Sequence, residues 1–263
     1  MKITANGIAI NYTLDGPVNA PVVTLSHSLA TTLAMWEPQM QALTARYRVL
    51  RYDTRGHGGT DAPAGAYSLD QLAEDARALL GALGVRKTHW VGLSMGGMIG
   101  QTLALKAPEL FSSLTLCDTS SRIPPEARPV WDERIRTAER QGIEPHVEPT
   151  LGRWFTPSFR EQRREVVDRV SAMIRGTNPV GYIGCCYALA ALDLADRIGA
   201  IKLPTLIIVG EDDQGTPVAA SRVMHEQIAG SQLVVLKSAS HLSNMEQPEA
   251  FTRALTEFLA KLG

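Results

Sequence analysis

Residues 92–97 read Gly92-Leu93-Ser94-Met95-Gly96-Gly97, and they join the apolar run 89–91 to a helix-like stretch, Met98–Lys106. This is the G-x-S-x-G pattern, in which a sharp strand-to-helix turn raises a serine hydroxyl above the end of a sheet. Glycines beside the serine permit close backbone approaches that a Cβ atom would obstruct. An ordinary glycine-rich turn is the alternative, but the flanking elements suit a nucleophile. We therefore expect Ser94 to be a nucleophile.

The elements around this turn alternate between strands and helices. Short apolar runs predict strands at residues 8–13, 22–25, 47–52, 88–91, 114–117, 205–209 and 233–236. Amphipathic spacing predicts helices at residues 36–45, 68–83, 98–106, 218–228 and 248–262. Strands that alternate with helices in this way predict a mostly parallel sheet with helices on both faces.

The alternation stops between residues 122 and 195. This stretch contains no convincing strand, and its amphipathic helical segments are broken by prolines and a glycine. We therefore expect a helical lid at about 122–195, inserted into a core of about 1–121 and 196–263. The chain of 263 residues is then a single domain, because an α/β chain of this length can bury one large core.

Composition excludes several classes of protein. The 26 basic and 27 acidic side chains argue against a nucleic-acid or anionic-membrane partner. No apolar run is long enough to span a bilayer, and the N-terminal residues lack the apolar segment of a signal peptide. Three cysteines without metal-ligand spacing favour buried thiols in a reducing cytoplasm. No metal-site spacing, P-loop or dinucleotide fingerprint is present, so we expect no metal and no cofactor.

A serine hydroxyl needs a base, and the base needs a group that orients it. His241 follows the predicted strand 233–236, and Asp213 follows the predicted strand 205–209. Loops after parallel strands emerge at one edge of the sheet, where ligands bind. The chain order Ser94, Asp213, His241 is the order expected for this kind of turn. We therefore expect these three residues to form a catalytic triad.

Other residues compete for the same roles. His27 and His57 also lie in loops at strand ends, although His57 fits a packed turn better. The acid has three alternatives, because any carboxylate that reaches the imidazole can select its tautomer: Glu211, Asp212 and, at the end of the strand 114–117, Asp118.

Hydrolysis through serine also needs donors for the developing oxyanion. Met95, directly after the nucleophile at a helix N-terminus, is expected to supply one backbone N–H. The loop of residues 26–30 is expected to supply the second, with Leu29 as the candidate. Each donor is worth about 3–4 kcal/mol of transition-state stabilisation. Enzymes that form an alkyl-enzyme use an aspartate in this turn. This chain has a serine there, which predicts acyl transfer.

The chain resembles the α/β-hydrolase superfamily over nearly its whole length, and within it the 3-oxoadipate enol-lactonases of aromatic degradation. Six segments carry the resemblance: residues 26–31, 35–39, 49–58, 92–97, 153–156 and 239–244. It implies an α/β-hydrolase fold with a mostly parallel eight-stranded sheet flanked by helices. It also implies a small-molecule lactone or ester as substrate.

Some positions depart from the lactonase pattern. His27 stands where these lactonases have asparagine, and Ala30 stands where they have glycine. The departures put the exact lactone in doubt, so an acyl-homoserine lactonase and a broad carboxylesterase are alternatives. Carbon–carbon bond hydrolysis and perhydrolysis use the same triad. A ligand-binding receptor on the same fold is the non-enzymatic alternative.

The expected lid is rich in arginine. Residues 122–175 contain eleven arginines and no lysine, and ten acidic residues lie within residues 121–195. Arginine can bind a carboxylate through two parallel hydrogen bonds, which would suit an acidic lactone. Because so many acidic residues share this stretch, solvated helix faces are the better explanation for most of these arginines. Arg153 and Trp154 are the candidates for substrate binding.

Overall fold

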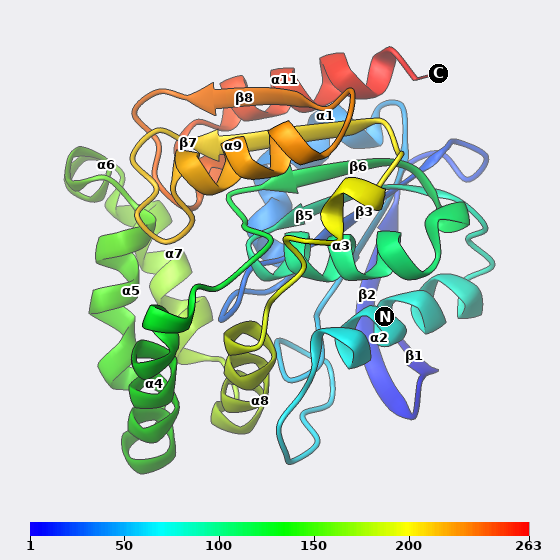
Figure 1. The fold of residues 1–263 in the computed structure, drawn as a ribbon. Coiled ribbons are helices and arrows are strands. Elements are labelled where there is room, and N and C mark those ends of the chain that lie inside the picture. The colour runs from blue at the N-terminus through cyan, green and yellow to red at the C-terminus, as the bar shows by residue number, and fades with distance from the viewer. Residues whose placement is uncertain (263) are drawn as a thin grey trace.

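The computed structural model describes residues 1–262, and its centre is one eight-stranded sheet with the strand order β1-β2-β4-β3-β5-β6-β7-β8 (Figure 1). The strands are β1 (Lys2–Ala5), β2 (Ile8–Asp15), β3 (Val22–Ser26), β4 (Arg48–Tyr52), β5 (Thr88–Leu93), β6 (Phe111–Cys117), β7 (Thr205–Gly210) and β8 (Gln232–Leu236). All pairs from β4 to β8 are parallel, whereas β1 and β2 pair antiparallel with their neighbours. The prediction of a mostly parallel sheet is confirmed. The strand β1 was not predicted, because its four residues carry no apolar run.

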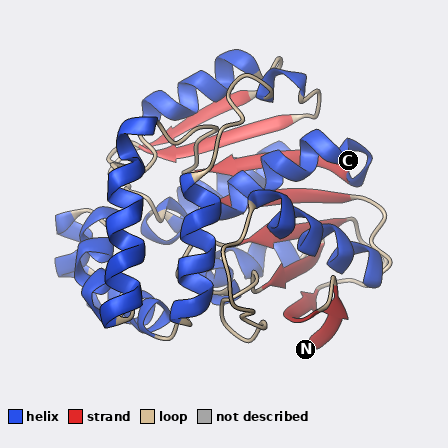
Figure 2. Ribbon diagram, turned by 60° about the horizontal axis from the view of Figure 1, so that its bottom comes forward, coloured by secondary structure: helices blue, strands red, loops and turns tan. Residues whose placement is uncertain are grey.

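Helices cover both faces of the sheet (Figure 2). One face carries α1, α10 and α11, and the other carries α2, α3 and α9 (Figure 1). Their bounds are α1 (Glu37–Thr44), α2 (Leu69–Ala82), α3 (Met95–Lys106), α9 (Val218–Gln227), α10 (Ser243–Glu246) and α11 (Pro248–Ala260). The central strands β5 and β7 are buried along their whole length because helices cover both faces.

Local sequence signals place the helix ends. The Ser68 hydroxyl caps α2 by accepting a hydrogen bond from the Gln71 N–H at 3.1 Å. Pro248 occupies the first turn of α11. Proline lacks a backbone N–H, and in the first turn such a group would have no acceptor within the helix. Four of the five predicted helices match observed ones to within two residues at each end, which is the usual scatter. The fifth, predicted at residues 98–106, begins three residues earlier, at Met95.

Five helices lie between β6 and β7, in the segment where no strand was expected. They are α4 (Arg128–Gln141), α5 (Val147–Trp154), α6 (Pro157–Gln162), α7 (Arg164–Arg175) and α8 (Pro179–Ala190). We call residues 122–195 the helical insertion. Its two ends meet at an isolated β-bridge between Arg122 and Asp193, whose side chains also form an ion pair of 2.6 Å. In Figure 1 the arrowheads of β7 and β8 point toward this insertion.

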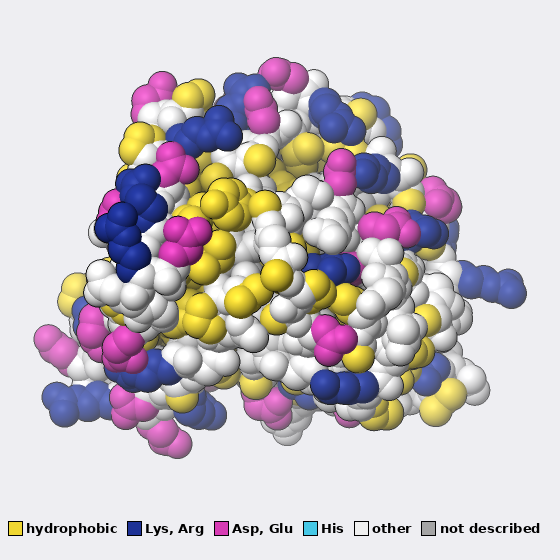
Figure 3. Space-filling model, turned by 90° about the horizontal axis from the view of Figure 1, so that it is seen from below, with side chains coloured by type: hydrophobic (Ala, Val, Ile, Leu, Met, Phe, Trp, Pro, Cys, Tyr) yellow, Lys and Arg dark blue, Asp and Glu magenta, His cyan; other side chains and the backbone are white. Residues whose placement is uncertain are grey.

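The surface near α4 and α8 is partly apolar. Figure 3 shows hydrophobic side chains gathered toward the middle of the face seen from below, with charged side chains mostly around them. Val130 of α4 and Val180 and Tyr187 of α8 are among the exposed large apolar side chains. Within residues 1–262, no helix has the length and apolar character needed to cross a bilayer.

Candidate active site

Ser94 lies in a strained turn between β5 and α3. Its backbone has φ 53° and ψ −114°, a conformation that non-glycine residues rarely adopt. The turn needs glycine on both sides: a Cβ atom on Gly92 would lie 2.1 Å from the Gly96 carbonyl oxygen, and one on Gly96 would lie 2.1 Å from the Ser26 carbonyl oxygen. The predicted strand–turn–helix context of Ser94 is therefore present in the structure.

His241 and Asp213 meet as predicted, beyond the ends of β8 and β7. The His241 Nδ1 and the Asp213 Oδ2 are 2.8 Å apart. The other carboxylate oxygen, Oδ1, accepts the N–H groups of Gly215 at 2.8 Å and Thr216 at 3.0 Å. Burial raises the pKa of Asp213, but the neighbouring His241 and the hydrogen bonds from Thr216 lower it by more, so the pKa lies below its usual value. An ionised Asp213 accepts a hydrogen bond from the Nδ1–H of His241, which leaves the lone pair on Nε2 available as a base.

The competing acid, Asp118, is occupied elsewhere. Its Oδ1 accepts the Gly210 N–H at 2.8 Å, and its Oδ2 accepts the hydroxyl proton of Ser243. Burial, and next the negative charge of Asp213, raise the pKa of Asp118 well above its usual value. Asp118 therefore connects β6 to β7 and α10 and makes no hydrogen bond to His241.

The competing histidines are also occupied. In both His27 and His57, Nδ1 lies at a backbone carbonyl oxygen and Nε2 accepts a backbone N–H. Burial lowers the pKa of both imidazoles, that of His57 to about 3. With both ring nitrogens in use, neither imidazole is available as a base.

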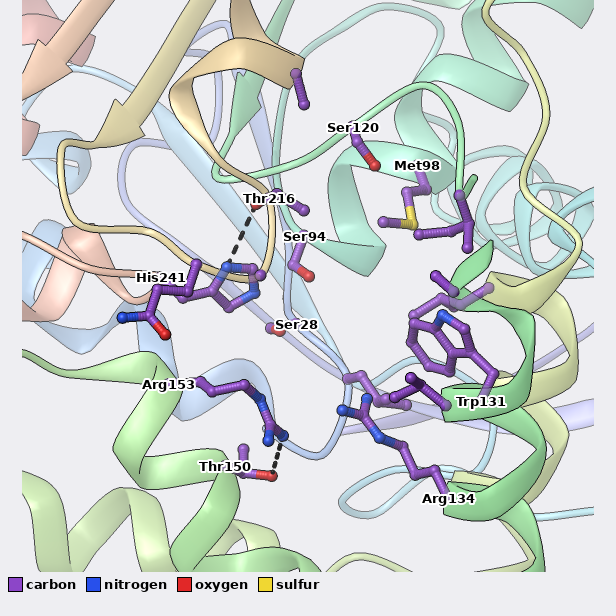
Figure 4. Close-up of a pocket in the computed structure, with 18 of the residues that line it drawn as sticks. Ser28, Ser94, Met98, Ser120, Trp131, Arg134, Thr150, Arg153, Thr216 and His241 are labelled. Atoms are coloured by element: carbon purple, nitrogen blue, oxygen red, sulfur yellow. Dashed lines mark hydrogen bonds between the residues drawn. The ribbon is translucent and has the colours of Figure 1, made fainter. Parts of the chain in front are cut away.

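The serine and the histidine share one cavity. A cavity of about 500 Å³ is lined by Ser94, His241 and side chains of the helical insertion. Figure 4 shows the Ser94 hydroxyl next to the His241 imidazole. Leu29 also lines the cavity. Met95 is the first residue of α3, so its N–H has no acceptor within the helix.

Arg153 and Trp154, the two residues predicted to bind substrate, both line this cavity. The Trp154 ring stacks on the His241 imidazole with a centroid distance of 6.0 Å. Arg153 donates to the Thr150 hydroxyl at 3.3 Å (Figure 4).

Sequence reasoning missed Arg134, which lines the cavity beside Trp131. Its guanidinium lies 4.7 Å from the centre of the Trp131 ring. Burial lowers the pKa of Arg153, and the positive charge of Arg134 lowers it further. The cavity lining contains no Asp or Glu within residues 1–262. The spacing of Arg134 three residues after Trp131 on α4 was the available signal.

Glu246 connects the helical insertion to the His241 loop. One of its carboxylate oxygens accepts the Thr156 N–H at 3.0 Å, and the other accepts the Ser240 N–H at 2.8 Å. Two further hydrogen bonds cross the same boundary: the Ser240 hydroxyl donates to the Arg153 carbonyl at 2.8 Å, and the Leu242 N–H donates to the Trp154 carbonyl at 3.2 Å. Residues 153–156 are thereby held against the loop that carries His241.

We expect the variant Glu246→Ala to lower the free energy of unfolding by about 1–3 kcal/mol, because the N–H groups of half-buried Thr156 and buried Ser240 lose their acceptors. Chemical denaturation followed by circular dichroism measures the change. Glu249→Ala, an exposed glutamate in the first turn of α11, is the matched control and should cost no more than about 1 kcal/mol. Equal losses in the two variants would contradict the role of Glu246.

No metal-binding cluster accompanies these residues. Among residues 1–262, no group of three or more His, Cys, Asp and Glu side chains is arranged to hold a metal ion.

The chain is similar to known hydrolases over most of its length. The model of the alpha/beta hydrolase fold family matches residues 21–248. 3-Oxoadipate enol-lactonase 2 of Acinetobacter baylyi is 40% identical over 253 residues, which cover 96% of this chain and 94% of that protein. The crystal structure of the enol-lactonase from Burkholderia xenovorans LB400 is 38% identical, with a TM-score of 0.95 over 99% of this chain and all of that one. A hydrolase structure from Pseudomonas aeruginosa PA01 is 42% identical, with a TM-score of 0.94 over 98% of this chain and 97% of that one.

These matches confirm the predicted fold, the resemblance to enol-lactonases and the prediction of an ester or lactone hydrolase. The family model spans most of the chain, and the enol-lactonase similarity spans nearly all of it. The chain therefore belongs to the α/β-hydrolase family.

Proposed function

We propose that this protein hydrolyses a small lactone through an acyl-enzyme on Ser94, and that its substrate resembles 3-oxoadipate enol-lactone. The observation that carries the proposal is the His241–Asp213 hydrogen bond of 2.8 Å at a cavity that also contains a serine in a strained turn. A histidine held in this tautomer beside a serine hydroxyl is the arrangement that nucleophilic acyl transfer requires.

In the proposed reaction, the His241 Nε2 takes the hydroxyl proton while Ser94 attacks the lactone carbonyl. The oxyanion that forms accepts hydrogen bonds from the N–H groups of Leu29 and Met95. Collapse of the tetrahedral intermediate opens the ring, and His241 returns its proton to the departing oxygen. Water then attacks the acyl-enzyme with the same histidine as base and releases the acid. The helical insertion serves as the lid over this site.

The charge in the cavity favours a substrate that carries a carboxylate. Arg134 and Arg153 face a lining without acidic residues, while the third lining arginine, Arg122, forms ion pairs with Asp193 and Asp196. Figure 4 shows the side chains of Arg134 and Arg153 directed into the cavity from α4 and α5. A carboxylate in this cavity can accept charge-assisted hydrogen bonds from both guanidinium groups.

A turnover panel tests the proposed function. It contains the enol-lactone derived from muconolactone, acyl-homoserine lactones and neutral nitrophenyl esters. We expect the highest kcat/KM for the enol-lactone, because it alone in the panel combines a lactone with a free carboxylate. A higher kcat/KM for the homoserine lactones would contradict the proposed substrate, and no turnover of any compound would contradict hydrolysis itself.

Charge removal tests the two arginines. We expect Arg134→Gln and Arg153→Gln each to raise KM for a nitrophenyl ester of a dicarboxylic acid by about 10- to 100-fold, which corresponds to one lost charge-assisted hydrogen bond. KM for a neutral nitrophenyl ester of equal length should stay the same. Arg136→Gln is the matched control, since Arg136 lies on the same helix but pairs with Glu133 at the surface. Equal KM changes for both esters would contradict carboxylate binding.

A further inference from the structure

In the turn after β3, the peptide group between Ser28 and Leu29 is held by three hydrogen bonds to its carbonyl oxygen. The Ser28 carbonyl oxygen accepts the Nδ1–H of His27 at 2.7 Å, the hydroxyl of Thr31 at 2.8 Å and the Thr31 N–H at 3.3 Å. A carbonyl oxygen can only accept, so the His27 proton is on Nδ1. Three donors from two side chains and the backbone therefore hold this carbonyl in one direction.

His27 is held in this tautomer from its other side. Its Nε2 accepts the Thr54 N–H at 2.8 Å, which requires a lone pair on that nitrogen. The side chain is completely buried, and burial lowers its pKa, so that the neutral form is favoured. The imidazole thus connects the loop after β4 to the Ser28 carbonyl.

The Ser28 carbonyl and the Leu29 N–H belong to the same peptide group. In a planar trans peptide these two groups point in opposite directions, and residues 1–262 contain no cis peptide. The direction of the carbonyl therefore determines the direction of the N–H. Ser28 and Leu29 both line the cavity that contains Ser94.

We propose that His27 is a positioning residue that orients the Leu29 N–H toward the oxyanion by holding the Ser28 carbonyl. The inference rests on the proposed function, because it presupposes acyl transfer on Ser94. Rigid placement of an oxyanion donor contributes to the rate because no reorganisation is needed as the charge develops.

The next peptide group is held in a similar way. Ala30 has φ 57°, in the left-handed region that an alanine adopts only under constraint. Its N–H donates to the His57 Nε2 at 2.9 Å. The two histidine rings lie 5.2 Å apart, between the loops after β3 and β4. The conformation of residues 28–30 therefore depends on two imidazoles that do not line the cavity.

Two variants of His27 separate positioning from simple packing. His27→Ala removes the donor to the Ser28 carbonyl, and we expect kcat for a nitrophenyl ester to fall by about 10- to 100-fold with little change in KM, since the donor is displaced but not removed. His27→Asn keeps a donor at the δ position and should recover most of kcat. Binding of a trifluoromethyl ketone, whose adduct with serine carries an oxyanion, should weaken in parallel with kcat. Binding of the secondary alcohol that corresponds to this ketone, which forms no oxyanion, should stay the same.

His89→Ala is the matched control, because His89 is buried at the start of β5 and bonds to the Ser113 hydroxyl at 2.9 Å. It should lower the melting temperature without changing the ratio of ketone to alcohol affinity. Thr31→Val removes another donor to the same carbonyl and should weaken ketone binding to a smaller extent. It provides the measurement if His27→Ala does not fold. Unchanged ketone affinity in His27→Ala, or in Thr31→Val if His27→Ala does not fold, would overturn the role of His27 and leave the proposed function standing. A wild-type protein that neither cleaves the ester nor binds the ketone would overturn the proposed function itself.

Discussion

Replacement of Ser94 by alanine is expected to reduce kcat for a nitrophenyl ester by about 10⁶-fold, because the loss of a serine nucleophile removes the acyl-enzyme route entirely. The residual rate comes from binding and from the oxyanion donors. The fold should persist, since alanine tolerates the positive φ of this turn no worse than serine does. Steady-state kinetics and circular dichroism of the purified variant measure both quantities.

Labelling by a fluorophosphonate probe tests directly whether Ser94 is the nucleophile. The wild-type protein should gain the mass of one phosphonyl group on the peptide that contains Ser94, and Ser94→Ala should gain none. Ser221→Ala is the control, because Ser221 is a completely buried serine on α9 that does not line the cavity. Full activity in Ser94→Ala, or labelling at another serine, would rule out this nucleophile.

Replacement of Asp213 by asparagine is expected to reduce kcat by about 10⁴-fold, the size of the effect when a triad histidine is held in the wrong tautomer. The Oδ1 position accepts two backbone N–H groups, so the amide oxygen of the asparagine must occupy it. The amide nitrogen then faces the His241 Nδ1 and donates to it. The imidazole proton moves to Nε2, where a lone pair is needed to accept the Ser94 proton.

Asp118→Asn is the matched control for this experiment. Asparagine can accept the Gly210 N–H and donate to the Ser243 hydroxyl, so both contacts of Asp118 have a replacement. We expect kcat to change only a few-fold in this variant. A larger loss in Asp118→Asn than in Asp213→Asn, measured with the same ester, would identify Asp118 as the functional acid.

The local elements were predictable because their causes are local. The Ser68 cap, the glycines around Ser94 and the apolar runs of β5 and β7 act on neighbouring residues. The strand β1 was missed because its stability comes from pairing with β2 and from packing against α2, neither of which leaves a pattern in its four residues. The roles of Asp118 and Asp213 could be ranked from the sequence by position only, since both follow strands at the same sheet edge.

Arg153 was predicted to lie at the cavity, but the sequence did not distinguish the second arginine there, Arg134, from its neighbours. Arg134 is one of eleven arginines between residues 122 and 175, and several of the others pair with acidic side chains at the surface. Only the packing of α4 and α5 around the cavity separates Arg134 and Arg153 from the rest. Burial and charge pairing are properties of the assembled structure, and composition alone does not reveal them.

By itself the sequence determined the fold class and the chain order of Ser94, Asp213 and His241, because strand and helix periodicity and the nucleophile turn are encoded in short segments. Tertiary structure decided which carboxylate bonds to His241, which arginines face the cavity, and which groups hold the Ser28–Leu29 peptide. Each of these depends on contacts between residues far apart in the chain: Asp213 lies 28 residues from His241, and His27 lies 27 residues from Thr54. Hydrogen bonds act over about 3 Å, so only the folded arrangement selects among chemically equivalent candidates.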